Sequence, residues 1–299
     1  MNDSAERTAN QCVEGQIDEF AQSLETCLDM DLLTYLGPLL YGADSILRKL
    51  VEARAARRPN LMMMLETSGG YVEPVRRIVA VLRRHYDRIE FIVPDHAMSA
   101  GTVLVVSGDA IHMDYYSTLG PIDPQTQGSQ GTPISALGYL VQYNRLLSKA
   151  NRGKASSAEL AMLLNFDQGD LYSYEQDREL SIQLLEEWLV KYKFRDWKTT
   201  ETRKKRVTDG MKRKRAREVA KILNDTDRWH THGAGITMEV LRRDLSLRID
   251  DFGSNQRAPD LPKWVKLYHG LMIDYMHRLD QRAVAHTTGR FVFPAIGGS

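Results

Sequence analysis

Short apolar runs alternate with amphipathic stretches over the first 125 residues of the chain. Residues 61–65 and 89–93 are dominated by apolar side chains, and each run has the length of a strand buried on both faces. Between them, residues 75–82 space their apolar side chains along one face of a helix. A third β-like stretch follows at residues 110–113. This order of strands and helices with short links predicts a parallel sheet covered by helices.

The chain changes character on either side of this α/β region. Residues 1–30 have the pattern of a polar lead followed by a helix, and residues 135–223 have an almost wholly helical pattern. Residues 264–279 form a final amphipathic stretch. We therefore expect an α/β fold with a mainly helical C-terminal half. The expected parts are a helical lead at 1–30, a core at 31–134, a helical and basic segment at 135–225, and a C-terminal segment at 226–299 that packs on the core.

The composition is that of a globular protein. Of the 299 residues, 42% are hydrophobic and 26% are charged, and the formal net charge is +1. A charge so near zero argues against a dedicated nucleic-acid-binding protein. The two cysteines, Cys12 and Cys27, are too few for a disulfide framework and fit a reducing compartment.

Two further features bear on location. Residues 1–19 are polar and acidic, which is unlike a secretory signal peptide. The chain also has no apolar run of the roughly 18 residues that a membrane-spanning helix needs. We therefore expect a cytoplasmic protein without a membrane span.

One segment is strongly basic. Residues 203–206 and 212–215 are all lysine or arginine. The simplest interpretation is a solvated helix face or a charged arm. The alternative is an electrostatic surface for a protein partner or for nucleic acid. Because no aromatic residues are interleaved for base stacking, we keep a protein partner for residues 203–217 as the main alternative.

The first motif with chemical potential is the turn Ser68-Gly69-Gly70, which follows the apolar run at 61–65. Two consecutive glycines let the backbone turn sharply and present N–H groups with no side chain in the way. An oxyanion hole needs such donors, aimed at the charge that develops on a carbonyl oxygen. Taken alone, the pair also fits an ordinary strand-to-helix turn.

The second motif surrounds Ser99. Alanine and glycine flank this serine in the run from Ala97 to Thr102, so it fits a tight turn at the N-terminus of a helix. There the helix dipole and the free N–H groups stabilise negative charge, and the N–H of Ala100 is a candidate second oxyanion donor. Taken alone, a serine in this position is more often a helix cap.

The third motif is Gly120-Pro121-Ile122-Asp123-Pro124, in which two prolines and a glycine constrain the backbone around one carboxylate. Taken alone, it fits a rigid turn. Ligand sites of open α/β sheets form at the carboxyl ends of the strands, which is where all three motifs are expected.

In this order and spacing, the three motifs resemble the ClpP/crotonase fold. They are more similar to the SppA group of peptidases, and most similar to the Clp-class serine dehydrogenase proteinases. The resemblance covers residues 32–125, with a weaker echo at 229–232. It implies a serine endopeptidase that forms an acyl-enzyme on Ser99. It also implies oxyanion donors from Gly69 or Gly70 together with Ala100, and an extended peptide substrate paired along the two glycines.

The general base stays open. The histidine that ClpP carries about 25 residues after its serine is missing, and Ile122 and Asp123 stand in that region. Lys149 fits the spacing of the catalytic lysine in some members of the SppA group. His232 matches the late Trp-Thr-His segment of the serine dehydrogenase proteinases, which are described as using Ser, His and Asp. Asp123 is a candidate either to orient such a histidine or to bind a substrate amide.

The remaining histidines are weaker candidates. His230 is a lesser option for the base, and His96 is close to Ser99 only in sequence. His112 stands between apolar neighbours on an expected strand, so we expect it to be packed. His230 and His232 form only a weak ligand pair, and we expect neither a metal site nor a cofactor.

Two other function classes remain open. A crotonase-like enzyme acting on acyl thioesters shares the two-amide oxyanion hole and needs no serine nucleophile. A scaffold that has lost catalysis needs only the fold, with the basic segment docking a partner. The resemblance also implies a homo-oligomer, with contacts expected in residues 135–190.

Overall fold

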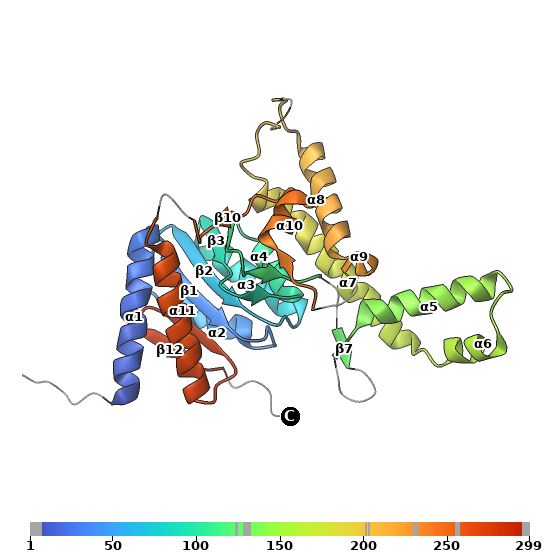
Figure 1. The fold of residues 1–299 in the computed structure, drawn as a ribbon, viewed down its shortest axis with the longest axis horizontal. Coiled ribbons are helices and arrows are strands. Elements are labelled where there is room, and N and C mark those ends of the chain that lie inside the picture. The colour runs from blue at the N-terminus through green and yellow to red at the C-terminus, as the bar shows by residue number, and fades with distance from the viewer. Residues whose placement is uncertain are drawn as a thin grey trace, which may run out of the picture.

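The computed structural model of the protein describes residues 8–122, 125–127, 133–200, 202, 204–229, 233–254 and 258–294. Its centre is a seven-stranded sheet in the order β10-β5-β3-β2-β1-β11-β12 (Figure 1). Neighbouring strands from β10 to β1 are parallel, whereas β11 and β12 form an antiparallel edge. The strands are β1 (Asp31–Leu36), β2 (Asn60–Glu66), β3 (Arg88–Ile92), β5 (Ala110–Met113), β10 (Asp250–Asp251), β11 (Val284–Thr287) and β12 (Arg290–Val292).

Helices cover both faces of this sheet. One face packs against α1 (Ala9–Leu28) and α11 (Leu261–Arg278), which lie side by side in Figure 1. The other face packs against α2 (Ala43–Glu52), α3 (Val72–His85) and α4 (Ala100–Val106). Met62 and Met64 face the first layer, while Leu61, Met63 and Leu65 face the second. The continuous apolar run of β2 is therefore explained by burial on both sides, as predicted.

A small second sheet lies at the carboxyl ends of the main strands. It consists of β4 (His96–Ala97), β6 (Thr118–Leu119) and β9 (Ile236–Thr237). β6 pairs parallel with β4 and antiparallel with β9. β9 follows β6 by more than 110 residues in the chain. Its pairing with β6 brings this late segment to the end of the main sheet where the three motifs lie.

The second half is helical but not continuously so. It contains α5 (Ala136–Asn151), α6 (Ser157–Leu164), α7 (Gln168–Trp188), a π-helix (Leu189–Lys193), α8 (Asp209–Leu223), α9 (Thr226–Trp229) and α10 (Met238–Arg243). The α7–α8 pair joins the main core through residues such as Leu185 and Val219. In contrast, α5 and α6 extend away from the sheet as an arm (Figure 1).

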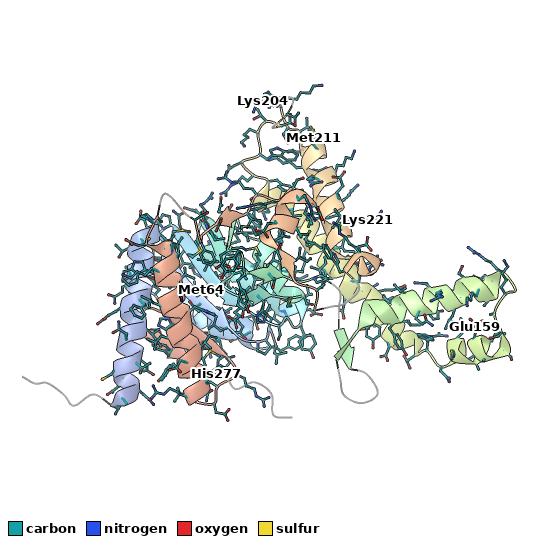
Figure 2. The ribbon with its side chains drawn as sticks, viewed as in Figure 1. Met64, Glu159, Lys204, Met211, Lys221 and His277 are labelled. Carbon is teal, nitrogen blue, oxygen red and sulfur yellow. The ribbon has the colours of Figure 1, made fainter. Side chains whose placement is uncertain are left out.

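Two sequence expectations need adjustment. Residues 194–208 are not helical where the structure describes them, so the helical pattern over 135–223 is interrupted. Only the later part of the basic segment is therefore a helix, α8, near Lys204 and Met211 in Figure 2. The β11–β12 hairpin was not foreseen, because its short strands have no alternation that separates them from a loop. Within the described ranges, none of the helices has the length and apolarity needed to cross a bilayer.

Candidate active site

Ser99 occupies the sharp turn between β4 and α4. Its φ of 51° and ψ of −118° lie in a region that residues other than glycine rarely adopt. Such a conformation costs about 1–3 kcal/mol and persists where the surrounding structure enforces it, commonly at functional sites. Ser99 is the N-cap residue of α4, but its side chain makes no capping hydrogen bond to the helix. This geometry resembles the strand–turn–helix elbow on which α/β-hydrolases carry a nucleophilic serine.

The glycine turn lies directly against Ser99. Gly69 has a φ of +104°, and a Cβ at this position would lie 2.9 Å from Ser99 Cβ. Gly70 pairs with Leu39 on its other side, where Leu39 N donates to Gly69 O at 2.7 Å and Tyr71 N to Leu39 O at 3.0 Å. A side chain at Gly70 would overlap the backbone of Leu39. Both positions therefore require glycine for steric reasons.

The hydrogen bonds separate the candidate oxyanion donors. The N–H of Gly69 donates to Thr67 Oγ1 at 3.0 Å. The N–H groups of Gly70 and Ala100 have no acceptor among the residues that the structure describes. Ala100 is the first residue of α4, where N–H groups have no partner within the helix. Gly70 and Ala100 are thus the pair of donors that a developing oxyanion can use.

The third turn is held against the serine turn by Thr102. Its Oγ1 lies 2.8 Å from the carbonyl oxygens of both Ala97 and Gly120, and it accepts the N–H of Gly120 at 3.0 Å. A Cβ on Gly120 would lie 2.6 Å from Met98 Sδ, so these two turns are in close contact. Sequence reasoning missed Thr102, although a hydroxyl so close to the serine in a run of small residues was the available signal.

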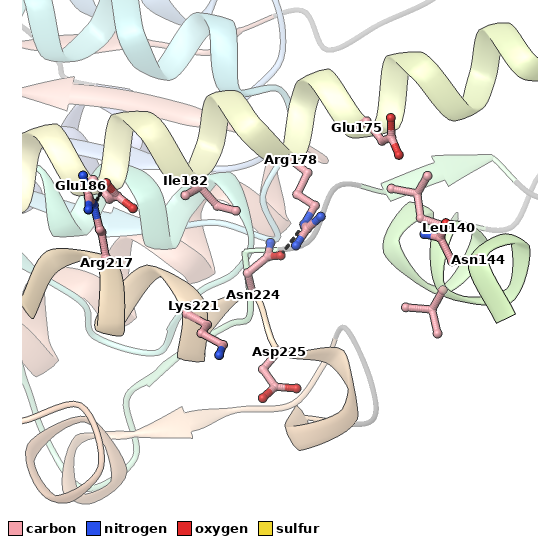
Figure 3. Close-up of a pocket in the computed structure, with 11 residues that line it drawn as sticks. Leu140, Asn144, Glu175, Arg178, Ile182, Glu186, Arg217, Lys221, Asn224 and Asp225 are labelled. Carbon is pink, nitrogen blue, oxygen red and sulfur yellow. Dashed lines mark hydrogen bonds and ion pairs between the residues drawn. The ribbon is translucent and has the colours of Figure 1, made fainter. Parts of the chain in front are cut away.

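The end of α8 anchors the chain just before Asp123. Ile122 N donates to Leu223 O at 3.0 Å, and Asn224 Nδ2 donates to Ile122 O at 3.2 Å. Arg178 Nε from α7 then donates to Asn224 Oδ1 at 2.8 Å, as Figure 3 shows beside a cavity of about 600 Å³. The helical second half therefore positions the third turn.

The candidate bases His230 and His232, and the candidate orienting carboxylate Asp123, lie outside the described residues. Lys149 is described, and its Nζ pairs with Glu159 Oε1 at 2.6 Å, between α5 and α6. The hydrogen bond from Lys149 and the N–H of Ser156 lower the pKa of Glu159 to about 2. Figure 2 shows Glu159 on the arm, far from the sheet. The structure therefore does not bring Lys149 to Ser99 within one chain, because α5 carries it away from the strand ends.

His112 is packed on β5, as expected. Its side chain is buried, and Nε2 lies 2.6 Å from Glu90 Oε2. Burial alone would raise the pKa of Glu90, but hydrogen bonds and charges from His112 and Arg88 bring it to about 2. His112 is therefore hydrogen-bonded to Glu90 inside the sheet and does not belong to the serine site.

One grouping at this edge has ligand chemistry that the sequence did not suggest. Ligand atoms of Glu66, Asp95 and His96 all lie within 4.8 Å of one another. Glu66 Oε2 also lies 2.5 Å from His269 Nε2 of α11. Glu66 is distant in sequence from the adjacent residues Asp95 and His96, and they meet because β2 and β3 are parallel neighbours. Among the described residues beside the site, these three could hold a cation, although Glu66 already has a partner in His269.

The region that contains this site matches a known family. Residues 40–140 match the model of the ClpP-like SDH-type serine proteinases. The match includes all three turns and ends before Lys149 and His232. The predicted resemblance is confirmed, as is the predicted fold class of a ClpP-like α/β protein with a mostly parallel sheet.

Two relatives from Methanocaldococcus jannaschii are similar over part of the chain. The uncharacterized protein MJ0137 is 37% identical over 83 residues, which are 28% of this chain and 28% of the relative. The uncharacterized protein MJ1495 is 32% identical over 99 residues, which are 32% of this chain and 34% of the relative. The chain thus spans about a third or less of the length of these relatives.

Proposed function

We propose that this chain is a serine peptidase that hydrolyses peptide bonds through an acyl-enzyme on Ser99. The observation that carries the proposal is the strained conformation of Ser99, with its Cβ against Gly69. On this proposal Ser99 Oγ attacks the carbonyl carbon, and the N–H groups of Gly70 and Ala100 stabilise the oxyanion. Collapse of the intermediate releases the amine, and water then hydrolyses the ester.

The glycine turn would also bind the substrate backbone. Leu39 occupies one edge of Gly70, and its other edge carries the unpaired N–H. An extended peptide can add to that edge as a short strand. Tyr41 and Tyr71 flank this position, stacked at 4.8 Å, and they are 67% and 51% exposed. Such an exposed aromatic pair supports contact with apolar substrate side chains.

We propose His232 as the general base, oriented by Asp123. Two observations on described residues support this choice. Gly235 packs on Thr118, so that a Cβ there would lie 2.9 Å from Thr118 Cγ2, and β9 pairs with β6. His232 is three residues before Gly235, a chain length that spans at most about 10 Å. Asp123 directly follows the anchored Ile122, and a histidine has the pKa that this role needs near neutral pH.

The test of the nucleophile uses a fluorophosphonate probe, which labels activated serines. Wild-type protein is expected to be labelled at Ser99, and Ser99→Ala is expected to abolish labelling and peptide cleavage, a loss of at least about 1,000-fold. Ser107→Ala is the matched control, because Ser107 caps the other end of α4. Wild-type protein that hydrolyses acyl thioesters without labelling would favour the crotonase-like alternative. Absence of both activities would favour the scaffold.

The base is tested by the labelling rate of two variants. His232→Ala is expected to slow labelling at least about 100-fold, because no group then accepts the Ser99 proton. Lys149→Met is expected to leave the rate unchanged, since its ammonium pairs with Glu159. The opposite pattern would exclude His232 and indicate that Lys149 acts in the site.

The arm and the basic segment support two further proposals. Helix α6 is rich in apolar residues but has no buried residue. Its side chains Leu160, Met162 and Leu164 are 46%, 55% and 85% exposed. Such an uncovered apolar helix favours burial by a second copy of the chain, in line with the expected homo-oligomer. The basic face of α8 remains the proposed surface for an acidic protein partner.

A further inference from the structure

A second cavity lies at the amino ends of the parallel strands, whereas Ser99 lies beyond their carboxyl ends. Arg88 opens β3 and Asp109 immediately precedes β5, so this cavity adjoins the amino ends of parallel strands. The π-helix, the segment after it, Arg215 of α8 and residues 246–250 complete its wall. Its volume of about 470 Å³ is in the range of small-molecule sites. The cavity therefore shares no wall with the proposed catalytic turns.

Lys193 is the distinctive group of this cavity. It is the last residue of the π-helix Leu189–Lys193, a rare kind of turn that occurs frequently at functional sites. Within the part of the chain that the structure describes, its ammonium has no hydrogen bond and no ion pair. A charged group without a partner in desolvated surroundings is costly, and an anion in the cavity would remove that cost.

The surroundings of Lys193 alter its titration. Burial lowers the pKa of Lys193 to about 8. Asp250 and Glu90 oppose this shift, whereas Arg248 and Arg88 add to it. At neutral pH the ammonium thus remains mostly protonated, and it loses its charge under mildly alkaline conditions.

The other charged groups of the wall already have partners. Asp196 is the most weakly held of them, 3.9 Å from Arg88 and largely exposed. Among the described residues, Lys193 is therefore the cation of this wall that has no ion-pair partner, and its charge is available to a ligand. The pairs are Arg88 with Glu90 at 2.5 Å, Asp109 with Arg83 at 2.7 Å and with Arg195 at 2.8 Å, Arg215 with Glu218 at 2.9 Å, and Arg248 with Asp250 at 3.4 Å.

The uncharged part of the wall has two kinds of side chain. Phe194 and Trp197 meet edge to face at 5.7 Å and form an aromatic surface. Thr199, Thr200 and Ser246 add hydroxyl groups that can donate or accept hydrogen bonds. A flat apolar group fits the aromatic surface, and the hydroxyls can bind polar substituents.

We propose that this cavity binds a small ligand with a flat apolar body and one anionic group, whose charge pairs with Lys193 Nζ. The ligand class includes aromatic carboxylates, sulfonates and phosphates. The site is independent of peptide hydrolysis, because no residue of its wall belongs to the three turns around Ser99.

The test uses 1-anilinonaphthalene-8-sulfonate, a fluorescent aromatic anion, and N-phenyl-1-naphthylamine, which has the same rings without the charge. The full chain is titrated with each probe at about pH 7 and about pH 9.5, on either side of the Lys193 pKa. The anion is expected to bind more tightly than the neutral probe at the lower pH. Its affinity is expected to fall about tenfold at the higher pH, as Lys193 loses its proton.

Two variants locate the effect. Lys193→Met keeps the length of the side chain and is expected to weaken binding of the anion about tenfold near neutral pH and to remove its pH dependence. Lys191→Met, an exposed lysine on the same turn, is expected to bind both probes like the wild type. Circular dichroism checks that both variants fold. Equal affinity of wild type and Lys193→Met for the anion would overturn the proposal. If Lys193→Met does not fold, an affinity of the wild type that stays constant over the pH range would overturn it.

Discussion

The two ends of the strands in the central sheet each carry a site, one built mainly from backbone groups and the other from side chains. The carboxyl ends of the strands are called the carboxyl edge here, and their amino ends the amino edge. At the carboxyl edge, the candidate active site is built mainly from backbone, with the N–H groups of Gly70 and Ala100 beside the strained Ser99. At the amino edge, the second cavity is built from long side chains that approach from β3, the π-helix and residues 246–250. A backbone site depends on close approach and tolerates no added atoms. A side-chain site depends on charges whose partners come from distant elements.

Among changes that leave Ser99 and the proposed base in place, the largest expected effect comes from a single methyl group added at the carboxyl ends of the strands. Gly69→Ala is expected to reduce fluorophosphonate labelling at least about 100-fold, because the new Cβ would lie 2.9 Å from Ser99 Cβ and displace the oxyanion turn. Gly42→Ala is the matched control. Gly42 has a similar φ of +99°, but a Cβ there has no neighbour within 4 Å.

Both variants are expected to lose about 1 kcal/mol of stability or somewhat more from the left-handed backbone, measured by urea denaturation. Only Gly69→Ala is expected to lose labelling. Retention of labelling in Gly69→Ala would mean that the turn does not support the reaction.

An intermediate effect is expected for the hydroxyl that joins the turns. Thr102→Val removes the group that accepts the Gly120 N–H and lies 2.8 Å from the Ala97 and Gly120 carbonyls. Because Thr102 is fully buried, we expect a loss of about 1–3 kcal/mol in the free energy of unfolding, with slower labelling. Thr102→Ser keeps the hydroxyl and is expected to keep the labelling rate. Equal labelling rates for Thr102→Val and Thr102→Ser would show that the Thr102 hydroxyl does not support the reaction at Ser99.

The smallest expected effect on the site itself concerns a charge inside the sheet, near the amino ends of the strands, and it is measured as stability. The pKa of Glu90 is lowered from 4.5 to about 2 in the folded protein, so Glu90 stabilises the fold above the unfolded-state pKa. This contribution is lost as pH falls from about 4.5 through about 2. Glu90→Gln is expected to lose less stability than the wild type over that range, measured by urea denaturation at each pH. Parallel pH profiles would show that the pair with His112 and Arg88 contributes nothing.

Much of the carboxyl edge was predictable because its determinants are local. Glycine at 69 and 70 and the small residues around Ser99 are each dictated by the backbone at that position. Their order along β-α-β units then implies that they meet at one edge of a parallel sheet. The choice between Gly69 and Gly70 as donor was not predictable, since it depends on Thr67 Oγ1 taking one N–H.

The failures have a common cause in contacts between distant residues. Lys149 has a suitable sequence spacing from Ser99, but α5 extends away from the core and Lys149 forms an ion pair with Glu159. The cluster of Glu66, Asp95 and His96 and the cavity around Lys193 both join residues from separate elements. No local pattern encodes such meetings.

The residues of this chain therefore specify, without further information, an α/β sheet and a serine held between two glycine-containing turns. Those features follow from local sterics, which require glycine or small residues at the turns, and from burial of strands on both faces, which requires continuous apolar runs. The tertiary structure decides which N–H groups remain for an oxyanion, which lysine has an ion-pair partner, and where Lys193 faces a cavity. These outcomes depend on desolvation and on competition between partners, which arise only when distant segments pack together.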